Sequence, residues 1–392
     1  MGENESMKLE KSKLLMPLLG VTTLGLLSVS TWADDNMQKR SQYDRKESTS
    51  TQHQNNNNSQ FRQITPNAGP TVHNGADIFI TASFIYWRAY QDGLNYATPA
   101  PFNAAWGFTD VESSAQAAIG TDWGPGFKIA LGLDTSHDGW DVYAEYTWNS
   151  FAETSKIGYA PSTVATGATA SKLLNPNDSS LFRSDDATAN WKLRFNKIDL
   201  MLGRNFFLSQ YLTMKPAVGF TGTWQHQNMT AKYTRRDTSF APAGLTPAPT
   251  LNAYVKNELV LKQYGIGLRL GSDFAWYMTK QFSLYSNLFA NLYWTDYTTQ
   301  SNKETLHSPD NSLAKTYIDQ SNDDHYAVKF AGEVELGIMW ETYFCENDYH
   351  FAARLGWEMQ NWVNWARFGN GATMHDGSLS FQGANVKFRF DF

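Results

Sequence analysis

Cysteine is almost absent from this chain of 392 residues, in which Cys345 is the single example. One cysteine cannot form an internal disulfide, so a disulfide framework is excluded as the source of stability. Beyond the N-terminus the sequence also lacks any run of about 18 apolar residues, which excludes a protein that crosses a bilayer with helices. Catalytic signatures are missing too, because no metalloprotease helix motif, phosphate loop or Gly-x-Ser-x-Gly turn occurs. We therefore expect no catalytic residue, no metal and no cofactor.

Aromatic residues, in contrast, are abundant in a chain that is polar on average. They make up 15% of the residues, with 14 Trp, 19 Tyr and 24 Phe, while the mean hydropathy is -0.47. A high aromatic content together with a polar mean hydropathy is typical of transmembrane β-barrels, because every second strand residue faces water.

The N-terminus has the features of a secretory signal peptide over residues 1–33. Lysines precede the apolar run LLMPLLGVTTLGLLSVS, and the small residues Thr31 and Ala33 follow it, so we expect cleavage after Ala33. A single anchoring helix is the alternative, but the stretch is short and polar, acidic sequence follows it. Residues 34–70 contain STSTQHQNNNNSQ and are expected to form a disordered polar linker. The folded part then covers residues 71–392.

Alternating rows of apolar and charged residues begin after Gly75 and predict β-strands. In the C-terminal ANVKFRFDF the aromatic residues share one face of an extended strand and the charged residues share the other. GFKIALGLD and WDVYAEYTWN alternate in the same way on the two sides of TSHDG, which predicts a hairpin. The row at 191–206 changes face between Phe195 and Ile198, which suggests a β-bulge.

The connections between these rows are alternately long and short. Residues 225–258, 296–325 and 361–378 form long connections, for example, whereas 135–139 and 278–281 form short ones. Short turns on one rim and long loops on the other are typical of an outer-membrane barrel with both termini on the periplasmic side. We predict an all-β, transmembrane, antiparallel up-and-down β-barrel of about ten strands. Hidden hairpins in 91–123 or 150–190 would raise the count to twelve or more.

Tryptophans near the strand ends are expected to form the membrane girdle, where an indole keeps its ring in lipid and its N–H in water. The five are Trp140, Trp148, Trp224, Trp294 and Trp340. Trp140 and Trp148 share a face, and their spacing corresponds to a height on the order of 20 Å, close to the expected apolar band of about 25 Å. Aromatics that fill a soluble core are the alternative, but they do not explain the alternating loop lengths.

Several segments resemble one family of surface proteins. DIFITASFIYWRAYQDGLNYA, PGFKIALGLDTSHDGWDVYAEYTW and LGRNFFLSQYLTMKPAVGFTGTWQHQ are similar to the Legionella-type major outer membrane protein family, whose MOMP-like members also occur in chlamydia-related bacteria. The resemblance extends from about Gly75 to Phe392 and implies an outer-membrane barrel with porin activity. It also implies that Phe392, a terminal aromatic residue, is a signal for the barrel-assembly machinery. The single cysteine departs from the disulfide-linked chlamydial members.

The charged residues on the inward rows are where we expect a pore, with small residues between them. They are Lys128, Asp141, Glu145, Lys197, Asp199, Lys215, Arg269, Lys329, Glu333, Glu335, Arg354, Glu358, Lys387, Arg389 and Asp391. Two interpretations stay open, since the small residues either leave a water-filled passage or make room for ion pairs that plug a narrow barrel.

The predicted function is passive diffusion of small hydrophilic solutes and ions. A surface structural or adhesin barrel is the alternative, and an outer-membrane hydrolase using Asp323, Asp324 and His325 is a less favoured one. The outer loop 296–325 has six acids and two lysines, so Asp319, Asp323 and Asp324 are expected to form an acidic mouth with a weak cation preference. Expected partners are outer-membrane lipid, lipopolysaccharide, the barrel-assembly machinery and other copies of the chain, but no nucleic acid.

Overall fold

The structure is a computed structural model that describes residues 66–73, 75, 77–103, 107–108, 116–135, 139–158, 169–174, 184–235, 253–307, 314–322, 325–368 and 375–392. Among these residues no helix is long and apolar enough to cross a membrane. The expected signal peptide with its cleavage site at Ala33 lies outside them, as does the expected linker up to residue 65.

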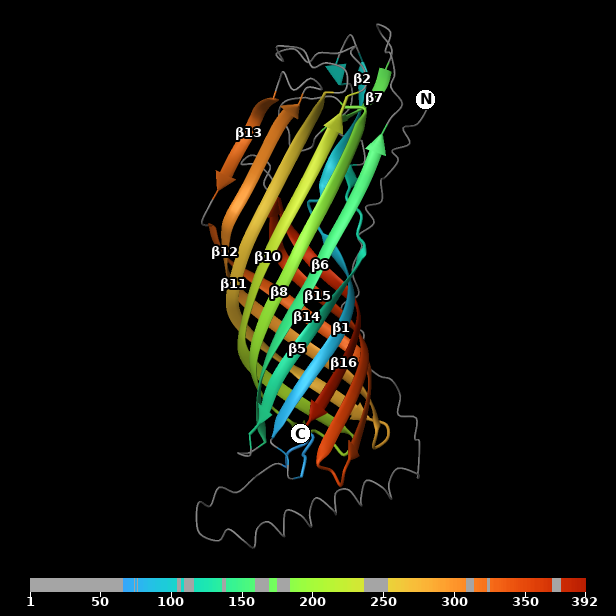
Figure 1. Cartoon of the computed structure of the whole chain (residues 1–392), viewed down its shortest axis with the longest axis vertical. Helices are drawn as coiled ribbons and strands as arrows, with labels where there is room; N and C mark the ends of the chain where they lie inside the picture. The colour runs from blue at the N-terminus through green and yellow to red at the C-terminus, as the bar shows by residue number, and fades with distance from the viewer. Residues whose placement is uncertain are drawn as a thin grey trace, which may run out of the picture. The chain divides into compact units, whose positions relative to one another are not determined.

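Ten antiparallel strands form a closed barrel (Figure 1). Each strand pairs with its neighbours along the chain, and the ring closes through the pairing of β1 with β16. The strands are β1 (Ile78–Gln91), β5 (Trp123–Asp134), β6 (Trp140–Gly158), β8 (Asp186–Arg204), β10 (Leu212–Thr234), β11 (Tyr254–Tyr277), β12 (Phe282–His307), β14 (His325–Phe344), β15 (Tyr349–Phe368) and β16 (His375–Asp391). The predicted fold class is therefore confirmed, with ten strands in the barrel wall.

The remaining described strands are short and are not part of the ring of ten. β2 (Asn95–Asn103), β3 (Gly107–Phe108), β4 (Ala117–Ala118) and β7 (Thr169–Leu174) pair with one another in a separate sheet. β13 (Ala314–Asn322) pairs with the end of β12, and β9 (Phe206–Phe207) pairs with the start of β10. The two long connections where hidden hairpins were considered thus contain strands, but these strands do not enter the ring.

The short turns lie on one rim of the barrel. The start of the first strand and the end of the last strand lie on the same rim. Residues 278–281 and 345–348 connect strands there, and Cys345 is exposed in the second of these turns. At the seam, the Phe392 N–H donates to the Ile78 carbonyl at 3.0 Å, and the Ile78 N–H donates to the Phe392 carbonyl at 3.2 Å. In outer-membrane barrels this short-turn rim faces the periplasm, so the other rim is extracellular.

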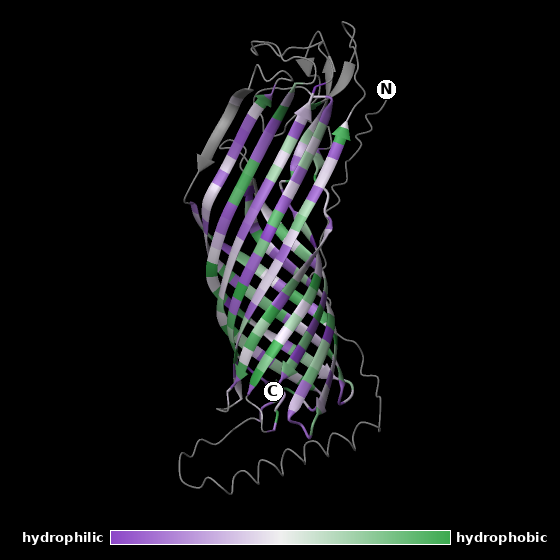
Figure 2. Cartoon of the chain, viewed as in Figure 1, coloured by the Kyte–Doolittle hydropathy of each residue, from purple (hydrophilic) through white to green (hydrophobic). Residues whose placement is uncertain are grey.

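An apolar band surrounds the periplasmic half of the barrel on its outer face. On β10 the outward residues from Val218 through Phe220 to Trp224 are apolar or glycine, and the inward residues between them include Thr221 and Thr223. Figure 2 shows hydrophobic and hydrophilic residues alternating along the barrel strands in this way. At the height of this band the barrel is apolar on its outer face and polar on its inner face, as expected for strands in lipid.

Beyond this band the pattern is reversed. On the extracellular part of β10 the outward residues His226, Asn228 and Lys232 are polar, whereas Met229 and Tyr233 point inward and are buried. The strand has 23 residues, whereas about 9–11 residues suffice to cross a bilayer. The extracellular part of the barrel therefore has a polar surface, and its interior buries large apolar side chains together with polar ones such as Gln225 and Gln227.

This reversal corrects two sequence-based predictions. The β-bulge expected between Phe195 and Ile198 is absent, because β8 pairs with β6 and β10 in continuous register there. Phe195 points into the interior of the extracellular part, and Ile198 points outward into lipid. The apolar residues therefore move from the outer to the inner face of β8 while the strand stays regular. The predicted connections 225–258 and 296–325 were also too long, because β10 continues to Thr234 and β12 to His307.

Candidate functional site in the barrel interior

The twelve residues predicted to line a pore all lie on the inward rows of their strands. They are Lys128, Asp141, Glu145, Lys215, Arg269, Lys329, Glu333, Glu335, Arg354, Glu358, Lys387 and Arg389. Most of them are buried, and ion pairs join several across the interior. Lys128 pairs with Glu358 at 2.7 Å. Their function as a pore lining stays a prediction.

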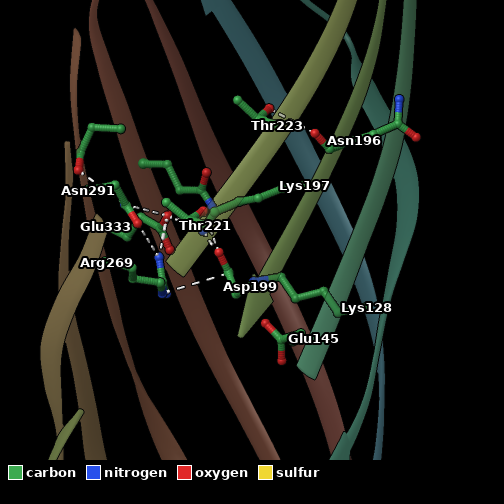
Figure 3. Close-up of polar contacts among 12 residues, drawn as sticks. Lys128, Glu145, Asn196, Lys197, Asp199, Thr221, Thr223, Arg269, Asn291 and Glu333 are labelled. Carbon is green, nitrogen blue, oxygen red and sulfur yellow. Dashed lines mark hydrogen bonds and ion pairs between the residues drawn. The ribbon is translucent and has the colours of Figure 1, made fainter. Parts of the chain in front are cut away.

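The best-connected group is a cluster of Lys197, Asp199, Arg269 and Glu333, which we call the ion-pair network (Figure 3). Glu333 Oε1 lies 2.5 Å from Lys197 Nζ and 2.7 Å from Arg269 Nη1. Asp199 Oδ2 lies 2.9 Å from Lys197 Nζ and 3.7 Å from Arg269 Nε. The two cations and two anions balance, which is what burial of charge requires.

Neutral side chains donate further hydrogen bonds to the two carboxylates of this network. The Asn291 side-chain amide donates to Glu333 Oε1 at 2.9 Å, and the Thr221 hydroxyl donates to Asp199 Oδ1 at 2.6 Å. Lys197 belongs to β8 and Glu333 to β14, and three barrel strands, β10, β11 and β12, lie between them. Their contact therefore joins opposite walls, so side chains occupy the lumen at this level.

An apolar layer lies on the extracellular side of these ion pairs. It consists of Trp87, Phe195, Tyr293, Trp362, Trp365 and Phe381, all at most 1% exposed, and we call it the aromatic layer. Phe195 contacts Phe381 with ring centroids 4.9 Å apart, and Trp362 contacts Trp365 at 4.6 Å. These rings come from β1, β8, β12, β15 and β16, and their mutual contacts place close-packed aromatic carbon inside the barrel.

A chain of polar contacts joins the aromatic layer to the charges below it. The Trp362 indole N–H donates to Gln360 at 3.1 Å, and the Gln360 amide donates to Glu358 at 2.8 Å. Glu358 then pairs with Lys128, whose Nζ lies 5.1 Å from the centre of the Trp87 ring. The aromatic and charged layers thus form one connected interior.

Two small polar cavities lie on the periplasmic side. One of about 60 Å³ is lined by Lys128, Glu145 and Lys387, among others, and one of about 110 Å³ reaches the periplasmic rim. Residues 66–73 cross this rim, because Asn67 bridges to Phe206 and the His73 N–H donates to the Asn347 carbonyl at 2.9 Å. We call residues 66–73 the periplasmic strap. Ala68, Gly69 and Pro70 of the strap form part of the wall of the larger cavity.

The other predicted site residues are placed differently. Trp140, Trp148, Trp224, Trp294 and Trp340 all lie on outward rows, with Trp294 61% exposed. Asp323 and Asp324 lie outside the described residues, and the structure describes the backbone of Asp319 on β13 but not its side chain. His325 begins β14 and is exposed. The acidic mouth therefore stays a prediction.

The aromatic layer was missed in the sequence-based prediction of the interior. Its signal was present, because Phe195 and Ile198 switch faces within one row, but a bulge gives the same pattern in sequence. Trp362 and Trp365 were missed for a related reason, since they fall in residues 361–378, which the alternation assigned to a loop. In the structure they belong to β15.

The chain was compared with protein families, curated proteins and solved structures. A family model described as the Legionella pneumophila major outer membrane protein precursor matches residues 68–392. No curated protein matches the chain. Among solved structures, the outer membrane protease OmpT from Escherichia coli is similar at 9% identity and a TM-score of 0.34, with 83% of this chain and 99% of that chain covered.

Two further structures show similar levels of likeness. The P. putida toluene transporter TodX has 10% identity and a TM-score of 0.27, with 82% of this chain and 91% of that chain covered. Ail, the attachment invasion locus protein of Yersinia pestis, has 8% identity and a TM-score of 0.19, with 79% and 97% covered. At such low identities and scores, none of the three structures indicates an activity for this chain.

Proposed function

Because the chain belongs to the Legionella pneumophila major outer membrane protein family, we propose that this outer-membrane barrel works as a surface protein with a closed lumen. In this proposal the extracellular part of the barrel is a rigid support that holds the outer loops above the membrane. The loops, in turn, are the surface that meets other molecules, as loops on rigid scaffolds commonly are.

The observation that carries the proposal is the cluster of packed apolar side chains inside the extracellular part. The aromatic layer continues outward into Trp191, Met229, Tyr233 and Leu261, all of which are buried. A diffusion pore for hydrophilic solutes needs water along its whole axis, and it gains nothing from an interior of this kind. A support gains rigidity from it, because close-packed cores resist deformation.

The sequence predicts a porin for small hydrophilic solutes and ions, and the second candidate is a narrower form of it that passes only ions and water. Two observations favour it: charged residues line the interior within the membrane, and the cavities of about 110 and 60 Å³ each have room for several waters. Such a porin needs the aromatic layer to move aside. Its conductance would then be small, and sugars would be excluded.

Liposome swelling separates the two candidates. Purified, folded protein is reconstituted and challenged with an isosmotic monosaccharide and, separately, with a potassium salt. The closed barrel predicts no swelling above protein-free liposomes with either solute, whereas the narrow porin predicts swelling with the salt only. The double variant Trp362→Ala with Trp365→Ala is the positive control, because it removes two rings of the seal. Rapid sugar entry through the unmodified protein would refute the proposal.

A further inference from the structure

A row of basic side chains crosses three neighbouring strands on the outside of the barrel. Arg194 on β8 lies opposite His226 on β10, which lies opposite Lys262 on β11. Lys192 lies two residues farther along β8 on the same face, and all four side chains are exposed. Neighbouring strands are about 4.8 Å apart and residues two apart on a strand about 7 Å, so the four occupy an area of about 10 by 7 Å. We call these four residues the basic patch.

The basic patch lies at the extracellular edge of the apolar band. Trp224 pairs with Asn196 on β8 and with Tyr264 on β11, and the Arg194–His226–Lys262 row is the next outward row beyond them. Trp224 and Tyr264 are exposed aromatic residues of the kind that mark the membrane interface. The patch is therefore at the height of the lipid headgroups, on the side where the outer leaflet lies.

The charged side chains of the patch have no ion-pair partner in the part of the chain that the structure describes. No acidic side chain among the described residues forms an ion pair with Lys192, Arg194 or Lys262, whereas Lys256 farther along β11 pairs with Glu258 at 2.6 Å. The nearest acid on the adjoining strand β12 is Asp296, which lies opposite Tyr264 in the girdle row.

Arg194 and Lys262 lie on either side of His226, two strands apart, and their like charges repel each other. Partial burial lowers the pKa of His226, and the nearby charges of Lys262 and Arg194 lower it further. A bound anion would relieve this repulsion. On β15 and β16, in contrast, the outward residues beyond Trp357 are uncharged, namely Asn361, Gln382 and Ser380. On these two strands the outward row at this height therefore carries no charge.

We propose that the basic patch binds the phosphate groups of an outer-leaflet glycolipid of the lipopolysaccharide class. Lysine and arginine bind phosphate through charge-assisted hydrogen bonds. Acyl chains of the same lipid would lie along the apolar band below, against residues such as Phe220 and Ile266, which are 62% and 68% exposed. The outer leaflet of this membrane consists of such lipids, which is why we choose them over phospholipids. The proposal does not depend on whether the lumen is open.

The test measures binding of three lipids to full-length protein in detergent, by native mass spectrometry. The lipids are lipopolysaccharide, the same material after enzymatic dephosphorylation, and phosphatidylglycerol. A combined Lys192→Gln, Arg194→Gln, His226→Gln and Lys262→Gln variant should bind lipopolysaccharide roughly tenfold or more weakly. A matched control, Lys280→Gln with Lys303→Gln, removes two exposed lysines elsewhere and should bind as the unmodified protein does.

Three results would overturn the proposal. They are unchanged affinity of the combined variant, equal affinity for the dephosphorylated lipid, and equal or tighter binding of phosphatidylglycerol. Heat-modifiable migration on gels verifies that each variant is folded. If the combined variant fails to fold, Arg194→Gln with Lys262→Gln replaces it, and Arg194→Lys must retain binding because it keeps the positive charge.

Discussion

Replacing Glu333 with glutamine would remove the carboxylate that two buried cations share. In the structure Glu333 Oε1 lies 2.5 Å from Lys197 Nζ and 2.7 Å from Arg269 Nη1, and all three side chains are at most 8% exposed. The variant leaves two positive charges facing Asp199 alone. Loss of one partner from a buried ion pair costs about 3–5 kcal/mol, because the remaining charge is uncompensated. We expect a loss of that size in the free energy of unfolding.

The assay is urea unfolding of the refolded barrel in lipid vesicles, followed by tryptophan fluorescence. Glu258→Gln is the matched control, because its pair with Lys256 is equally short at 2.6 Å but more than a third exposed. Exposed pairs contribute about 0.2–1 kcal/mol, so this control should change stability little. Adding Lys197→Met to Glu333→Gln restores the charge balance between Arg269 and Asp199. The double variant should therefore be less destabilised than the sum of the single variants. Equal losses in Glu333→Gln and Glu258→Gln, or strict additivity, would refute the reasoning.

Three further outcomes are expected. Trp362→Ala should lower the free energy of unfolding by about 3–5 kcal/mol, whereas Val363→Ala, which removes an outward-facing side chain next to it, should cost much less in the same urea titration. Gly219→Val should also destabilise the barrel, by about 1–3 kcal/mol, because a Cβ at Gly219 would collide with the Leu200 carbonyl; unchanged stability would contradict this. Phe392→Ala should reduce the heat-modifiable fraction in isolated outer membranes while Phe392→Tyr retains it, and equal assembly of both variants would argue against an assembly signal.

The part of the barrel within lipid was predictable from the sequence. Its strands place apolar side chains toward lipid and charged side chains toward the interior, so apolar and charged residues alternate with a period of two. Rows such as those on β5 and β14 have that period, and alternating connection lengths then determine the strand count. Above the membrane the same strands exchange their apolar and polar faces. A search for strands with apolar residues outside and polar residues inside therefore ends the β10 strand at Trp224, although the strand continues to Thr234.

Contacts between distant strands were beyond sequence-based prediction. Inward charges such as Lys197 and Glu333 could be assigned to the lumen one by one, but their meeting across the interior depends on the diameter and stagger of the closed ring. The choice between a water-filled passage and a plug therefore stayed open in the sequence, and the structure places ion pairs and aromatic rings in the interior.

Access to the lumen from outside tests the closed barrel most directly. Ser83 points inward on β1 opposite Lys128, on the periplasmic side of the aromatic layer. Ser83→Cys in a Cys345→Ser background provides a single thiol there, and a charged, membrane-impermeant thiol reagent is added to intact cells. Lys303→Cys in the same background is the exposed reference. The closed lumen predicts rapid labelling of the Lys303→Cys variant and none of the Ser83→Cys variant, whereas comparable labelling rates of the two variants would contradict it.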